Sequence, residues 1–241
     1  MNRVYHITVL ALGLGLVGCG NGGGNENAEN IDPCNTVLAF NDTNFNYYTT
    51  ANNTLAPSNN TELELMPDDL LSVGSAVFLK PAMTPPYSIE FEYTIFDDDG
   101  ESNVPSSFNS ADGIVVMLAK DETPYDSIDP PFGGARGYHP GDGYGVHFSI
   151  YETRYMSITD GAGDPLAYLE DFSPNVYPHG EWRKVKVTVR GDSIVVDYAD
   201  NTGFLTYNGT LVQTYDRVGI GAGTGGADGQ HKIRNVKVCS L

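Results

Sequence analysis

Basic residues, helical periodicity and known catalytic motifs are all scarce in this sequence. The chain has only 13 lysines and arginines against 31 acidic residues, a formal net charge of −18. So acidic a chain is expected to avoid nucleic acid and anionic lipid surfaces, and such an excess most often serves solubility. We find no Ser/His/Asp elbow, no pair of metal-binding histidines and no phosphate-binding loop. These absences give no support to the enzyme classes that those motifs mark.

Long apolar runs are also rare, and the one at residues 7–17 is too short to cross a bilayer as a mature helix. It ends in Leu-Val-Gly-Cys, which resembles a bacterial lipobox, and Cys19 would then carry a diacylglycerol. An ordinary secretory peptide with a chance cysteine is the alternative. We predict a lipoprotein signal peptide at residues 1–18 and a flexible Gly/Asn-rich tether at residues 19–33. The protein would then be exported to the bacterial cell envelope, with the outer membrane favoured, and would meet a membrane only through its lipid.

Only two cysteines remain after Cys19, and they lie at the edges of the expected domain, residues 34–241. In an oxidising compartment such a pair indicates a disulfide, here Cys34–Cys239, although two free thiols are the alternative. The bridge would require the first and last strands of the domain to lie side by side. About 208 residues suit one large β-domain with a substantial core.

Strand patterns dominate after residue 60, and no segment after residue 18 keeps a helical period over three turns. Tyr87 to Ile95 alternates apolar and polar side chains, and Gly191-Asp192 forms a hairpin turn. We expect strands at 62–66, 76–79, 87–95, 113–119, 143–151, 155–159, 185–189, 193–198, 218–222 and 232–238. Many short strands with Gly, Pro, Asn and Asp turns predict an all-β, two-sheet sandwich.

Asp112 stands at the start of Gly113–Ala119, the most apolar run of the mature chain. A carboxylate at the mouth of a buried strand is costly unless something uses it. Local sequence alone favours a turn cap, which needs only nearby backbone N–H groups. The following loop, residues 121–142, is long, rich in proline and glycine and contains aromatic residues, which favours a functional loop.

Four segments in order resemble the L-type (legume-like) lectin family, whose fold is the concanavalin A-like antiparallel β-sandwich, or jelly roll. They cover roughly residues 85–241. The segments are Ala111-Asp112-Gly113 with its strand, Gly133-Gly134, Val146 to Tyr151, and Gly219 to Gly226.

The resemblance implies a carbohydrate site. An Asp carboxylate accepts two sugar hydroxyls, glycines let backbone donors approach closely, and an aromatic ring packs on the apolar side of a pyranose. Carried over by position, Asp112 is the acceptor, Gly134 a backbone donor and Tyr151 the stacking ring. The rim of the site would be Thr224, Gly225 and Gly226.

The family also holds a transition metal and calcium, and here the sequence departs from it. His147 and Ser149 stand where the family has two carboxylates, and Asp160 is a weak substitute for a later aspartate. Calcium prefers oxygen ligands, so His147 suits it poorly. We expect no certain cofactor, with Ca²⁺ the candidate and His147 and Asp160 as weak metal ligands.

The sequence therefore predicts a lipid-anchored, non-catalytic, lectin-like protein that binds a glycan or polysaccharide. One alternative is a polysaccharide hydrolase or lyase on the same fold. Glu90 and Glu92 share a strand face, but the hydrolase and lyase motifs are not met, so a solvated stripe is favoured. The other alternative is an adhesion module that binds a protein partner. The sequence gives no oligomeric state.

Overall fold

A computed structural model describes residues 34, 36–50, 55–67, 73–96, 112–120, 136, 138, 143–150, 155–169, 180–199, 201–212, 214–225 and 229–241. These residues all belong to one compact unit, Asp32–Leu241. They form fourteen strands, and none of them is helical. Within these ranges there is accordingly no helix of the length and apolarity needed to cross a membrane.

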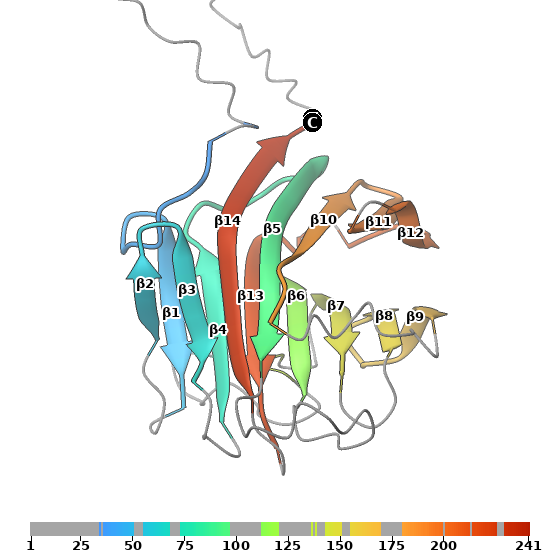
Figure 1. The fold of residues 1–241 in the computed structure, drawn as a ribbon. Coiled ribbons are helices and arrows are strands. Elements are labelled where there is room, and N and C mark those ends of the chain that lie inside the picture. The colour runs from blue at the N-terminus through green and yellow to red at the C-terminus, as the bar shows by residue number, and fades with distance from the viewer. Residues whose placement is uncertain are drawn as a thin grey trace, which may run out of the picture. The chain divides into compact units, whose positions relative to one another are not determined.

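Two seven-stranded antiparallel sheets build the unit (Figure 1). Sheet A has the order β1-β4-β13-β6-β7-β8-β9, and sheet B has the order β12-β11-β10-β5-β14-β3-β2. The strands are β1 Phe45–Thr49, β2 Ala56–Asn59, β3 Glu62–Met66, β4 Gly74–Leu79, β5 Tyr87–Phe96, β6 Gly113–Ala119, β7 Gly143–Ser149, β8 Tyr155–Thr159, β9 Pro165–Leu169, β10 Arg183–Val189, β11 Ser193–Tyr198, β12 Asn201–Asn208, β13 Arg217–Gly223 and β14 Gln230–Ser240.

The inner faces of the two sheets enclose a single large core. The apolar side chains that alternate with polar ones along β5 are buried against sheet A, because successive side chains of a strand point to opposite faces. The Tyr93 ring of sheet B lies 5.7 Å from the Phe148 ring of sheet A, and its hydroxyl bonds that of Tyr198 at 3.1 Å. The all-β sandwich predicted from the sequence is confirmed.

All ten strands expected from the sequence are present, with small shifts at their ends. The turn at Gly191-Asp192 joins β10 to β11, as predicted. Four strands were not expected, namely β1, β2, β9 and β12. They are the four edge strands, two in each sheet.

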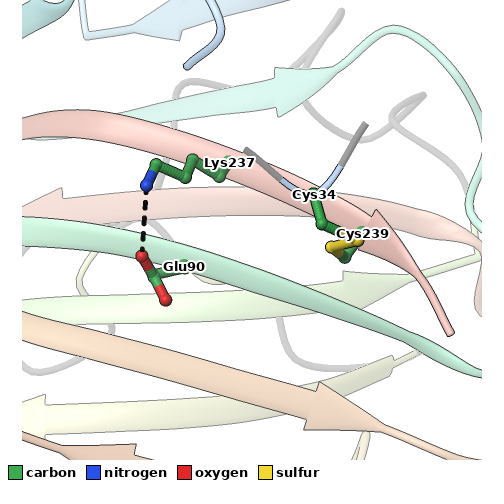
Figure 2. Close-up of a disulfide and its surroundings, with 4 residues drawn as sticks. All are labelled: Cys34, Glu90, Lys237 and Cys239. Atoms are coloured by element: carbon green, nitrogen blue, oxygen red, sulfur yellow. Dashed lines mark ion pairs between the residues drawn. A yellow bond between two sulfur atoms is a disulfide. The ribbon is translucent and has the colours of Figure 1, made fainter. Parts of the chain in front are cut away.

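The Cys34–Cys239 disulfide is present, with the two Cα atoms 4.6 Å apart (Figure 2). The expectation that it joins neighbouring first and last strands is wrong, because β1 lies in sheet A and β14 in sheet B. The chain ahead of β1 instead runs beside the distal half of β14, where the Leu38 N–H donates to the Val236 carbonyl at 2.8 Å. That half of β14 is free for it, because β3 pairs with β14 only from His231 to Arg234.

Strand β6 is buried on both faces, which explains its unbroken apolar sequence. Ile114, Val116 and Leu118 face the main core. Val115, Met117 and Ala119 face the other way and join a smaller cluster with Tyr138, Ala76 and Phe78. We call this second side, which also carries His147, Ser149 and Arg136, the outer face of sheet A.

Candidate functional site

Glycines hollow out the outer face of sheet A and let another segment lie directly on it. A Cβ added to Gly221 of β13 would stand 2.6 Å from the carbonyl oxygen of Arg136. One added to Gly113 of β6 would stand 2.0 Å from the carbonyl oxygen of Phe148 and 3.1 Å from Nε of Arg136. Real Cβ atoms do not approach a backbone oxygen so closely, so Gly221 lets the backbone at Arg136 reach β13, and Gly113 lets β6 lie against the Phe148 carbonyl of β7.

Asp112 is fixed by its main chain at one end of sheet A. Its N–H donates to the carbonyl of Gly223 at the end of β13 (2.7 Å), and its carbonyl accepts from the Ile150 N–H just past β7 (3.2 Å). The residue is 5 % exposed. Its Oδ2 atom is buried and has no hydrogen-bond partner among the described residues. Burial raises the pKa of Asp112, and the positive charge of Arg136 opposes this rise.

Arg136 brings a buried positive charge to the same place. It is 3 % exposed and has a left-handed backbone, with φ of 53°. Its Nε donates to the Asp112 carbonyl at 2.8 Å, and its Nη2 donates to Ser149 Oγ at 2.5 Å and to Tyr155 Oη at 3.4 Å. The guanidinium carbon also lies 5.5 Å from the centre of the Tyr155 ring. One side chain thus ties the start of β6 to β7 and β8.

His147 completes this cluster as a neutral imidazole. Nη1 of Arg136 lies 3.5 Å from His147 Nδ1, and because arginine can only donate, Nδ1 must accept. Nε2 therefore carries the proton and donates to Thr159 Oγ1 at 3.0 Å. Burial, and secondly the charge of Arg136, lowers the pKa of His147 to about 3. The edge-on ring of Tyr138, 5.4 Å away, covers the imidazole.

Comparison with known proteins shows the fold of this chain. No protein-family model matches the chain, and no curated protein matches it in sequence. Solved structures do match. The VIP36 exoplasmic/lumenal domain in a Ca²⁺/Man3GlcNAc-bound form is 16 % identical, with a TM-score of 0.63 over 85 % of this chain and 87 % of that one. Lectin II from Ulex europaeus is 14 % identical, with a TM-score of 0.61 over 85 % and 96 %. The lectin from Bauhinia forficata in complex with GalNAc is 15 % identical, with a TM-score of 0.61 over 84 % and 95 %.

The fold is that of the L-type lectins. The jelly roll expected from the resemblance is thereby confirmed, over far more of the chain than the four motifs cover. Asp112 lies at an end of sheet A of this lectin fold, beside Gly223, and Thr224 and Gly225 follow directly.

The predicted rim residues of the lectin site are only partly described. Thr224 is fully buried, its N–H donates to the Val73 carbonyl (2.9 Å), and its Oγ1 accepts from the Val73 N–H (3.4 Å). Its side chain therefore fastens the chain after β13 to the start of β4. Gly225, beside it, is half-buried. Gly134, Tyr151, Gly226 and the lipidation residue Cys19 lie outside the described residues.

The residues at the family's metal positions do not fit a metal centre in this lectin fold. Both ring nitrogens of His147 are engaged by Arg136 and Thr159, and Ser149 accepts from Arg136. The Oδ1 atom of Asp160 accepts from the N–H groups of Ala162 and Asp164, which closes the turn between β8 and β9. Throughout the described ranges, no three His, Cys, Asp or Glu side chains cluster as metal ligands.

Glu90 and Glu92, the carboxylates of the enzyme alternative, lie on the outer face of sheet B. Glu90 pairs with Lys184 at 3.2 Å. It also pairs with Lys237 at 3.6 Å, as Figure 2 shows. Glu92 accepts from Arg234 Nε at 2.5 Å and from Asn235 Nδ2 at 3.1 Å. This is the arrangement of a solvated charge network, as the sequence favoured, and both carboxylates already have basic partners.

Arg136 is the residue of the site that sequence analysis missed. The available signal was a single basic residue within Gly133-Gly134-Ala135-Arg136-Gly137, in a chain poor in basic residues. The family resemblance assigns a sugar contact to Gly134 and no role to Arg136.

Proposed function

We propose that this protein binds carbohydrate at the Asp112 end of sheet A and does not transform it. The observation that carries the proposal is the buried Asp112 Oδ2, which lacks a hydrogen-bond partner among the described residues. A buried carboxylate oxygen without a donor calls for one from a ligand. Sugar hydroxyls are such donors, and charge-assisted bonds to them are strong.

The similar structures support the same ligand class. Their names record a mannose-containing glycan on VIP36 and GalNAc on the Bauhinia lectin. The non-catalytic part of the proposal is supported by the ion pairs that hold Glu90 and Glu92, because a glycosidase needs one carboxyl group as an acid and the other as a base or nucleophile.

A glycan array read with wild type, Asp112→Asn and Asp192→Asn tests the proposal. Asparagine keeps the size of the side chain but removes its charge, so we expect affinity to fall by roughly 10–100-fold in Asp112→Asn, the value of one charge-assisted bond. Asp192 lies in the β10–β11 turn, outside the site, and its variant should bind as wild type does. Unchanged binding by Asp112→Asn would refute the assigned site.

Calcium belongs in the same experiment, because VIP36 structures are named as Ca²⁺-bound and as metal-free forms. The array is therefore read with Ca²⁺ and with chelator. If no glycan is bound in either condition, the adhesion module that meets a protein partner replaces the carbohydrate reading.

We also propose that the protein is exported and anchored through a lipid on Cys19, with the outer membrane favoured. The support is the lipobox-like Leu16-Val17-Gly18-Cys19 and the polar, glycine-rich stretch after it. Cys19→Ser should move the protein from the membrane fraction to the soluble fraction. Retention of the variant in the membrane fraction would exclude this anchor.

A further inference from the structure

The Arg136 guanidinium occupies the place in this fold where the family resemblance puts metal ions. His147 and Ser149 are the two positions of β7 that correspond to the family's carboxylate ligands, and both hydrogen-bond Arg136. In this chain both positions carry neutral groups, which suit an organic cation that donates hydrogen bonds. The hydrogen-bonding groups at these two positions and the cation beside them therefore match in chemistry.

A divalent ion and the guanidinium cannot share this position. An ion in contact with Ser149 Oγ would meet Nη2, which already lies 2.5 Å from that oxygen. A divalent ion and a guanidinium in contact with the same oxygen repel each other strongly in a buried site, and the site offers no carboxylate from β7 to offset this repulsion. Binding of a metal here would therefore require Arg136 to leave.

The chain around Arg136 is shaped to hold the guanidinium in place. The left-handed backbone at Arg136 and the absence of a Cβ at Gly221 let the main chain lie on β13. The absence of a Cβ at Gly113 leaves room for Nε, which then reaches the Asp112 carbonyl. A guanidinium presents five N–H donors in a fixed plane, so it can hold several neutral acceptors at once, as a coordinated metal holds its ligands.

We infer that Arg136 is the resident cation of this lectin fold: its guanidinium takes the place of the family's metal ions, holds Asp112 in position, and makes the site independent of divalent metal. Arg136 is thus a positioning residue for Asp112. The role of Arg136 in positioning Asp112 for a sugar rests on the proposed carbohydrate function. Its role in place of a metal ion concerns only the folded protein and does not depend on that function.

The first experiment measures the midpoint of thermal unfolding of the wild-type protein after chelator treatment, then with ~5 mM Ca²⁺ or Mn²⁺, a concentration above the dissociation constants of extracellular calcium modules. A metal bound at 100 times its dissociation constant would raise the midpoint by roughly 5–10 °C in a domain of this size. We expect no shift in either direction. A rise of several degrees with either ion would overturn the inference.

The second experiment compares Arg136→Met, Arg136→Lys and the control Arg190→Met. Methionine keeps the apolar stem of Arg136 but removes its charge and donors, and lysine keeps the charge without the planar fork. We expect a midpoint lowered by roughly 5–10 °C in Arg136→Met and a smaller loss in Arg136→Lys. Arg190 is exposed in the turn after β10, so its variant should unfold as wild type does. An unchanged midpoint in Arg136→Met would refute the role of Arg136.

Glycan affinity of the same variants, measured at temperatures well below their unfolding midpoints, tests whether Arg136 positions Asp112. We expect a loss of roughly 10–100-fold in Arg136→Met, as for Asp112→Asn, with partial recovery in Arg136→Lys. Wild-type affinity in folded Arg136→Met would refute positioning of Asp112. If wild type binds no glycan, the carbohydrate proposal fails, while the thermal measurements still decide whether Arg136 stands in for metal.

Discussion

The outer face of sheet B carries its charges in pairs at the surface, whereas the described part of the outer face of sheet A holds the buried guanidinium of Arg136. The Glu90 side chain is 25 % exposed between Lys184 and Lys237, while Arg136 is 3 % exposed among a carbonyl, two hydroxyls and an imidazole. Surface pairs form and break at little cost, but a buried cation is expensive unless its surroundings are built for it. The contrast teaches that the face to which we assign the binding site is the one that buries a charge at high cost.

The largest effect is expected from a side chain at Gly113, where an added Cβ would press on the Phe148 main chain and stand 3.1 Å from Nε of Arg136. Gly113 has φ of 123°, and an added Cβ would stand 2.0 Å from the Phe148 carbonyl oxygen. We expect Gly113→Ala to lose about 4 kcal/mol in the free energy of unfolding, from backbone strain together with the clash. Urea unfolding measures this loss.

Gly163→Ala supplies the matched control. Gly163 also has a left-handed backbone, with φ of 85°, but an added Cβ there would meet nothing within 4 Å. Gly163→Ala should lower the free energy of unfolding only through backbone strain, by about 1 kcal/mol. Equal losses in the two variants would show that the close packing at Gly113 is not a constraint.

The pKa of His231 reports how far the positive charge of Arg136 acts into the core. It is fully buried, and its Nδ1 donates to the Gly229 carbonyl at 2.7 Å. Burial and, to a smaller extent, Arg136 lower the pKa of His231 to about 4, and the bond to Gly229 opposes them. In the unfolded chain His231 has a pKa near 6.5, so it binds a proton at a higher pH than in the folded protein. The contribution of neutral His231 to the free energy of unfolding is therefore complete above pH ~6.5 and is lost as the pH falls toward 4.

Between pH 7 and pH 5 this residue alone should remove about 2 kcal/mol from the free energy of unfolding. Urea titrations at the two pH values, for wild type and His231→Gln, measure its share as the difference between their pH dependences. Identical dependences would mean that His231 is not held neutral by the fold.

The smallest effect is expected on the outer face of sheet B. Glu92 and Arg234 form an ion pair whose side chains are 28 % and 33 % exposed. A double-mutant cycle with Glu92→Gln and Arg234→Met should give a coupling of about 0.5 kcal/mol, reduced further by high salt. A salt-insensitive coupling above ~2 kcal/mol would mean that the Glu92–Arg234 pair behaves as a buried ion pair, and the two faces would then not differ in the cost of their charges.

The strands that sequence analysis found and missed divide by position in the sheets. All ten interior strands could be read from alternation or from a continuous apolar run, because both neighbours and at least one face impose apolar side chains. The edge strands escape that constraint. Pro57 in β2 and Pro165 at the start of β9 are residues that an edge tolerates and a central strand does not. The turn-like Asn201-Thr-Gly opening of β12 hid that strand in the same way.

Whether a residue of the site could be predicted depends on whether its role is visible in the neighbouring sequence. The position of Asp112 at the mouth of β6 could be predicted, because a carboxylate before an apolar run is visible in the sequence. The partner of Asp112 could not be predicted, because Arg136 lies 24 positions further along the chain and no periodicity between them brings the two residues together. The contact depends on glycines of other strands, such as Gly221, which lies 85 positions beyond Arg136 (221 − 136).

The disulfide also decides how the domain carries a mechanical load. A force applied to the chain ahead of Cys34 enters the domain at this residue and passes through one covalent bond into β14, a strand hydrogen-bonded to both β5 and β3. The edge strand β1 and the Asp112 end of sheet A are bypassed. If the protein is anchored through Cys19 and binds a ligand as we propose, Cys34–Cys239 would stop the domain from unfolding from its N-terminal end when the anchor is pulled.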